Sequence, residues 1–154
     1  YKNSIYIESG NVVKDYEVFL DTSQSEIKGD YTIKIGDNKE TVPVTYSNGR
    51  LQYESKLEPL FDEEILNLVV QRDYFASLNI KETFKSAETE LSDIIYQPES
   101  QSELNKYLKN KYDMPEDTSC RVRLDCASGT IYSFSILMES KNKSVQIDLS
   151  IFKK

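Results

Sequence analysis

The residues of this chain that could do chemistry are mainly carboxylates, and they gather in two clusters. The first combines Glu58 with residues 62–64, and the second combines Glu88, Glu90 and Asp93. Several carboxylates can hold a hard cation, and a pair of them can hydrolyse a glycosidic bond. The first cluster lacks the spacing and turn glycine of a calcium loop and suits the positive end of a helix, while the second suits a solvated helix face. We therefore predict neither a metal site nor a catalytic pair.

Histidine is absent from all 154 residues. Its imidazole is the side chain that titrates near neutral pH, and it is the commonest metal ligand in proteins. Without it, the sequence offers no pairing of serine or cysteine with imidazole for nucleophilic catalysis. Ser128-Gly129 also lacks the second glycine of a nucleophile elbow. We expect a protein that is not an enzyme, has no catalytic residues and needs no cofactor.

The two cysteines, Cys120 and Cys126, lie on a run that alternates like a β-strand. In one strand their Cα atoms would be about 20 Å apart, at roughly 3.3 Å per residue. That distance is too long for a disulfide between them. Without histidine, two thiols also cannot complete a four-ligand zinc site. We expect two small buried apolar side chains.

Four residues are candidates for contact with a partner: Arg121, Arg123, Tyr53 and Tyr112. The arginines point to one side of a strand, beside Asp125, in a chain with four arginines and fifteen lysines. They could bind a carboxylate of an acidic partner or ligand, or pair with neighbouring acids on a solvent-facing strand. The two tyrosines belong to a set that cannot all enter the core, and exposed tyrosine is a frequent anchor in protein interfaces.

Alternation of apolar and polar residues at both ends of the chain predicts β-strands. The apolar positions near the N-terminal end are Ile5, Ile7, Tyr16, Val18, Leu20, Tyr31, Ile33 and Ile35. Asn48-Gly49 predicts a two-residue hairpin turn that sets Tyr46 opposite Leu51. Pro43 has no backbone N–H, so the strand before that turn should have an open edge.

The last third of the chain predicts a three-stranded meander with one apolar face. Its first strand is the run from Cys120 to Cys126. The apolar positions of the other two are Tyr132, Phe134, Ile136, Met138, Val145, Ile147, Leu149 and Ile151.

The middle of the chain has apolar residues at helical spacing. A first helix is predicted to start at Pro59 and to extend to Phe75. A second would start after Asn79 and stop before Pro98, and a third would open at Ser100 with a capping box. Strands followed by helices and then strands indicate an α+β fold. We expect antiparallel meanders from both chain ends, with two to three central helices packed on the apolar sheet face.

The length fits a single domain over residues 1–154. A subdivision is the alternative, with a β-meander at 1–57 and the helices plus the three-stranded meander at 58–154. The formal net charge of −7 repels a phosphate backbone, so we expect no nucleic-acid partner. No apolar run approaches the roughly 20 residues that cross a bilayer. A membrane would be reached only through a tether outside this chain.

Together these features favour a non-catalytic binding or interaction module with a protein partner. The chain begins at Tyr1 rather than methionine, which favours the soluble extracytoplasmic part of a membrane-tethered or lipid-anchored bacterial protein. The alternative is a cytoplasmic, acidic immunity or inhibitor protein that neutralises a basic partner. Two unpaired cysteines suit that compartment, and negative charge would steer a cationic partner.

Overall fold

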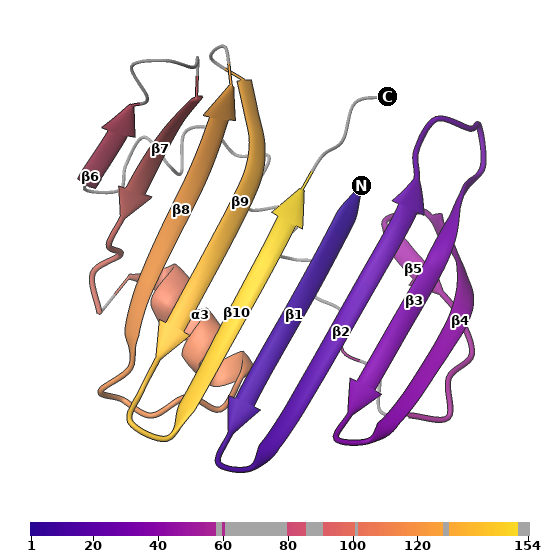
Figure 1. Cartoon of the computed structure of the whole chain (residues 1–154), viewed down its shortest axis with the longest axis horizontal. Coiled ribbons are helices and arrows are strands. Elements are labelled where there is room, and N and C mark those ends of the chain that lie inside the picture. The colour runs from indigo at the N-terminus through magenta and orange to yellow at the C-terminus, as the bar shows by residue number, and fades with distance from the viewer. Residues whose placement is uncertain (58–59, 61–79, 86–90, 101, 128–129, 151–154) are drawn as a thin grey trace.

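The computed structural model describes residues 1–57, 60, 80–85, 91–100, 102–127 and 130–150. These residues form one antiparallel sheet of ten strands in the order β5-β4-β3-β2-β1-β10-β9-β8-β7-β6 (Figure 1). The first five strands are β1 (Lys2–Ser9), β2 (Val12–Asp21), β3 (Ile27–Ile35), β4 (Asn38–Ser47) and β5 (Arg50–Gln52). The last five are β6 (Ile80–Lys85), β7 (Leu91–Tyr96), β8 (Ser119–Ala127), β9 (Thr130–Glu139) and β10 (Lys143–Ser150).

The sheet consists of two five-stranded meanders joined along one central seam. Within each meander, every strand pairs with its neighbours in sequence. At the seam, β1 pairs with β10 along its whole length, from Lys2 opposite Ser150 to Ser9 opposite Lys143. The first and last strands of the chain therefore hold its two halves together.

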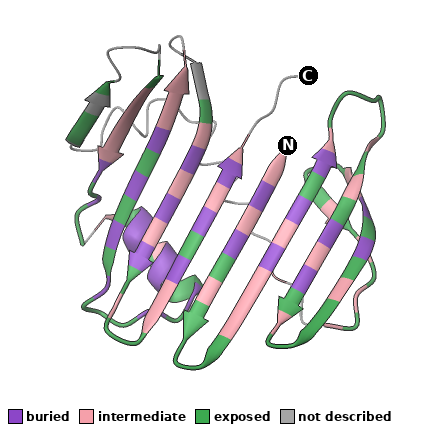
Figure 2. Ribbon diagram, viewed as in Figure 1, coloured by how far each residue is buried: buried purple, intermediate pink, exposed green. Residues whose placement is uncertain are grey.

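One face of the sheet, the inner face, carries the core, and the other, the open face, is polar. Buried and exposed residues alternate along the strands, as the period of two requires (Figure 2). The inner-face residues at 1% exposure or less are Ile5, Val18, Tyr31, Ile33, Val122, Phe134, Ile136, Met138, Val145 and Ile147. They come from both meanders, so a single core crosses the seam.

A short helix, α3 (Glu103–Lys111), covers part of the inner face and lies behind the sheet in Figure 1. Ser102 is its N-cap, and the Ser102 hydroxyl accepts a hydrogen bond from the backbone N–H of Asn105 at 3.3 Å. Leu104 and Leu108 are buried on the sheet side. In the described part of the chain, no helix is long and apolar enough to cross a membrane.

The segment after β5 is also fixed on the inner face. The ring of Tyr53 packs edge-on against the ring of Tyr31, with centroids 5.0 Å apart. The Glu40 carboxylate accepts hydrogen bonds from the backbone N–H groups of Lys56 and Leu57 and from the hydroxyl of Ser55. These contacts anchor the segment to β3 and β4.

The expected α+β fold with two to three central helices is wrong, because the described residues contain a single short helix in a mostly β structure. The predicted second helix is instead the hairpin of β6 and β7, and β7 pairs with β8 from Leu91 to Tyr96. Short apolar runs fit both periods, and Ile94-Ile95-Tyr96 favours a strand once a partner strand is present. The predicted first helix lies outside the described residues except for Leu60.

Other expectations are confirmed. Asn48 and Gly49 both have positive φ, and Tyr46 lies opposite Leu51 across the turn. At Pro43, β4 pairs only with β3 among the described strands, as an open edge requires. The predicted third helix exists, although its N-cap is Ser102 rather than Ser100.

Candidate functional site

A cavity of about 510 Å³ opens at the end of the β1–β2 hairpin, on the inner side of the sheet. Residues Ile7 and Ser9 of β1 line it, together with Val12, Lys14 and Tyr16 of β2. Ile7 lies directly opposite Lys14, and Ser9 lies opposite Val12. The antiparallel register therefore forms one wall of the cavity from alternate residues of two neighbouring strands.

The end of α3 forms the facing wall, and the start of β10 extends the sheet wall beside Ser9. Lys111, Tyr112 and Asp113 follow one another where the helix ends, and Lys143 is the first residue of β10. Asp113 has a φ of 48°, so the chain turns there in the left-handed conformation. The ammonium group of Lys143 donates a hydrogen bond to the Asp113 carbonyl oxygen at 3.0 Å. Leu60 also lines the cavity.

Three lysines from three separate segments thus meet at one cavity, which we call the lysine pocket: Lys14, Lys111 and Lys143. The side chain of Lys143 is only 19% exposed, and its ammonium group lies 4.0 Å from the carboxylate of Asp113, whose side chain is fully exposed. Lys111 also lies over the ring of Tyr107, 5.8 Å from the ring centre. In a chain of net charge −7, this pocket is a local concentration of positive charge.

The lysine pocket can bind an anion. Ammonium groups attract carboxylates and phosphates, and partial burial lowers the effective dielectric and strengthens that attraction. The hydroxyl groups of Ser9, Tyr16 and Tyr112 add hydrogen-bonding capacity. Across the residues that the structure describes, no group of three or more cysteine, aspartate or glutamate side chains could hold a metal ion.

Two of the predicted contact residues lie on the inner side of the sheet. Tyr112 is 4% exposed and lines the lysine pocket, so it is one of the tyrosines of that set that enter the core. Tyr53 is half-buried against Tyr31. Both tyrosines contribute to packing.

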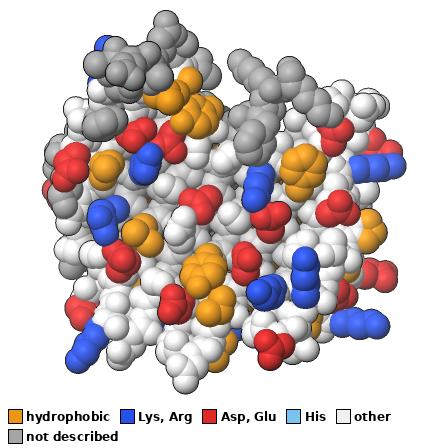
Figure 3. Space-filling view, viewed as in Figure 1, with side chains coloured by type: hydrophobic (Ala, Val, Ile, Leu, Met, Phe, Trp, Pro, Cys, Tyr) orange, Lys and Arg blue, Asp and Glu red, His pale blue; other side chains and the backbone are white. Residues whose placement is uncertain are grey.

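Arg121 and Arg123 lie on the open face, remote from the lysine pocket. Arg121 forms an ion pair with Glu139 at 2.6 Å, and Arg123 bridges Asp93 at 2.8 Å and Asp125 at 2.7 Å. The hydrogen bond to Asp125 raises the pKa of Arg123. Both arginines line a shallow depression of about 270 Å³, but intramolecular acids already neutralise their charges. Figure 3 shows the open face, on which acidic, basic and apolar side chains are interspersed.

Tyr132 belongs to the open face and not to the apolar stripe in which alternation placed it. The pairing of β8 with β9 shifts register between Asp125 and Cys126, which interrupts the alternation beside Tyr132. Tyr132 is 39% exposed, and it lies close enough to Arg123 to raise the pKa of that side chain.

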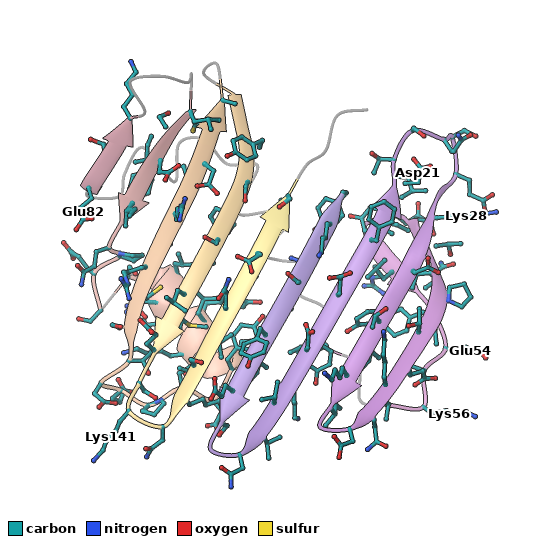
Figure 4. All side chains as sticks on the ribbon, viewed as in Figure 1. Asp21, Lys28, Glu54, Lys56, Glu82 and Lys141 are labelled. Carbon is teal, nitrogen blue, oxygen red and sulfur yellow. The ribbon has the colours of Figure 1, made fainter. Side chains whose placement is uncertain are left out.

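Sequence reasoning missed the lysines of the pocket, although it contained a signal for two of them. Lys14 is in phase with the buried Tyr16 of β2, and Lys143 is in phase with the buried Val145 of β10. A charged residue at an inward-facing strand position must reach solvent or a counterion at the sheet edge. By contrast Lys141, two residues before Lys143, points away from the sheet (Figure 4).

The other candidates give no second site. Of the two acidic clusters, the described residues include only Asp93, which pairs with Arg123. Cys120 is buried, as expected, Cys126 is half-buried, and both are free thiols on β8. Burial raises the pKa of Cys120 to about 11, which makes its thiol unreactive at neutral pH. In comparisons with known proteins, no family model matches this sequence, and no curated protein matches it significantly.

Proposed function

We propose that this chain is a non-catalytic binding module and that the lysine pocket receives a negatively charged group of its ligand. The observation that carries the proposal is the convergence of Lys14, Lys111 and Lys143 on one cavity. An anion held between three ammonium groups gains Coulomb attraction from each of them. Cavities of this volume are typical of ligand sites.

Nuclear magnetic resonance of the labelled protein tests this function. Decanoate, inorganic phosphate and a glutamate-rich peptide would be titrated separately into the protein. At least one anion should shift the backbone signals of Ser9, Lys14, Tyr112 and Lys143. Lys143→Met should reduce those shifts, whereas Lys28→Met should not, because Lys28 is exposed at the opposite end of the sheet and pairs with Glu26 (Figure 4). If no anion in this set shifts these signals, the proposed function is wrong.

A protein partner is a second candidate function, and the open face supports it. Tyr6, Phe19 and Tyr132 are 37%, 48% and 39% exposed there, and Tyr6 lies opposite Gln146, which lines the arginine depression. Aromatic side chains and arginine are the residues that most often anchor protein interfaces. Capture of partners from a native extract by the wild-type chain, compared with a Tyr6→Ser, Phe19→Ser variant, tests it. A partner retained equally by both proteins would contradict binding through this face.

We also propose an extracytoplasmic location, on a membrane tether outside this chain, for a bacterial protein. The support is the acidic net charge, the absence of histidine and the β-rich structure. Fractionation of cells that express the full-length gene tests this location. Recovery in the cytoplasmic fraction would favour the alternative, an acidic immunity or inhibitor protein. In that case, affinity capture of this protein should also recover a basic protein.

A further inference from the structure

We infer that Asn48 is a site of spontaneous deamidation and that its conversion to isoaspartate releases the edge strand β5. The site is the two-residue turn Asn48-Gly49, which joins β4 to β5. Asparagine reacts fastest in this way when glycine follows it, because glycine has no Cβ atom to shield its backbone nitrogen. The exposure of the turn, the unbonded side chain of Asn48 and the weak attachment of β5 all favour the reaction at this position.

The reaction needs only water and a base from the solvent. The backbone nitrogen of Gly49, once the base has taken its proton, attacks the side-chain carbon Cγ of Asn48. A C–N bond forms, the bond from Cγ to the amide nitrogen breaks, and ammonia leaves with a proton from the solvent, which gives a five-membered succinimide ring. Water then opens the ring at one of its two carbonyl carbons. Opening at Cγ gives aspartate, and opening at the backbone carbonyl carbon gives isoaspartate, in which the main chain runs through Cβ.

Both turn residues are accessible to solvent. Asn48 and Gly49 are exposed, and no heavy atom beyond the adjoining residues lies within 4 Å of the position that a Cβ atom of Gly49 would occupy. The Asn48 carboxamide forms no hydrogen bond with any residue that the structure describes. A solvent base can therefore reach the Gly49 amide, and the carboxamide is free to rotate toward it.

The turn must open before the ring can close, and β5 is weakly held. Asn48 and Gly49 have φ values of 53° and 77°, as a type I′ turn requires. Ring closure needs rotation about the Cα–C bond of Asn48, out of that turn. In the described sheet β5 is the outermost strand, and it pairs only with Thr45, Tyr46 and Ser47 of β4. Local opening of such an element needs far less free energy than global unfolding.

Isoaspartate does not fit the register of this hairpin. Its extra main-chain carbon lengthens a turn that sets Tyr46 opposite Leu51, and turn length fixes the register of a hairpin. Leu51 is half-buried against the core, while Arg50 and Gln52 are exposed, so Leu51 is the anchor of β5. A changed register displaces this anchor. The segment Thr45–Ser47 then becomes an open edge, to which a strand of another molecule can add.

Incubation of the protein at neutral pH, followed by peptide mapping with mass spectrometry, tests the reactivity. Trypsin releases Asn48 and Asn11 in separate peptides, residues 40–50 and 3–14. Asn11 is the matched control, because it is exposed in the turn between β1 and β2 but precedes a valine. Asn48 should deamidate at least about tenfold faster than Asn11, and Gly49→Ala should slow its reaction at least about tenfold. Smaller differences would overturn this assignment of the site.

Two leucine variants test whether opening of β5 limits the reaction. Leu51→Ala removes the anchor and should raise the deamidation rate of Asn48 at least about threefold. Leu91→Ala is the control, because Leu91 is 43% exposed on β7, and it should change the rate by less than about twofold. Circular dichroism confirms that both variants are folded, and Leu51→Val serves if Leu51→Ala does not fold. A smaller increase at Leu51 would contradict opening of β5 as the limiting step.

Hydrogen exchange of the aged protein tests the release of β5. The backbone amides of residues 45–52 should exchange at least about threefold faster in the isoaspartate form than in the unmodified protein. Freshly prepared Asn48→Asp carries the new charge on a normal main chain and should keep the slow exchange. Equal exchange in the isoaspartate and unmodified forms, or equally fast exchange in Asn48→Asp, would contradict release through a lengthened main chain.

Discussion

The phenolic hydroxyl of Tyr31 forms hydrogen bonds with both backbone polar groups of Leu60. It accepts a hydrogen bond from the Leu60 N–H at 2.8 Å and donates one to the Leu60 carbonyl oxygen. Tyr31 lies in the middle of β3 and is fully buried, while Leu60 is 29 residues later in the chain. Together with the contacts of Glu40, this side chain therefore attaches the segment after β5 to the inner face, where Leu60 also lines the lysine pocket.

Removal of that hydroxyl should destabilise the protein. Tyr31→Phe leaves the N–H and the carbonyl of Leu60 without their partner, so the free energy of unfolding should fall by about 1–3 kcal/mol. Urea denaturation measures the loss. Tyr6→Phe is the matched control, because Tyr6 is exposed on the open face and its change should stay within about 0.5 kcal/mol. Equal effects from the two variants would contradict this role for Tyr31.

Alkaline pH should unfold the protein through its buried tyrosines. Burial raises the pKa of Tyr31 and of Tyr1 above the ordinary value. The unfolded chain then loses these protons more easily, so stability is fully present below pH about 10 and is lost as the pH rises above it. Urea midpoints measured across this range should decline, and less steeply in Tyr31→Phe. A constant midpoint up to pH about 11 would contradict the prediction.

Glu40 should contribute a pH dependence of the opposite sign. The backbone N–H of Lys56 and the groups at Ser55 and Leu57 donate hydrogen bonds to its carboxylate and lower its pKa. Its contribution to stability is present above the unfolded pKa of about 4.3 and is lost as the pH falls below it. Glu40→Gln should therefore flatten the acid limb of the stability curve. The exposed Glu54 of the same segment, changed to Gln, should leave that limb unchanged (Figure 4).

Gly29 should tolerate no side chain. A Cβ atom at this position of β3 would overlap the carbonyl oxygen of Phe19 in β2, and that backbone cannot move without separating the strands. Gly29→Ala should cost about 3 kcal/mol or more. Gly10 has a φ of 58° but open space around it, so Gly10→Ala should cost only about 1–2 kcal/mol. Thermal and urea unfolding of both variants measure the two losses of stability. A larger loss in Gly10→Ala than in Gly29→Ala would contradict the steric overlap at Gly29.

The sequence predicts the strands at both ends well. One face of the sheet is exposed to solvent and the other is packed, so polar and apolar residues alternate strictly, as at Tyr16, Val18 and Leu20. It fails at β6 and β7, where Ile94 and Ile95 fit either period. There the pairing with β8, about 30 residues away, decides the structure. Local patterns do not contain such long-range information.

The lysine pocket shows the same limit. Lys14, Lys111 and Lys143 are far apart in the chain, and each resembles an ordinary surface lysine in its own segment. Only the pairing of β1 with both β2 and β10, together with the position of α3, brings them to one cavity. Lys14 and Lys143 occupy strand positions that face the core, and this was the one available signal. It identifies an unusual position for a charge but not the ligand of that charge.

The seam between β1 and β10 also has a consequence for biosynthesis. A ribosome releases β1 long before β10. During this interval β1 is an unpaired edge strand of the nascent N-terminal meander, and the core is incomplete. Until β10 has been synthesised, that edge can pair with a strand of another molecule. Chaperone binding to the unfinished polypeptide would then protect the yield of native protein, and truncation before β10 should produce aggregates.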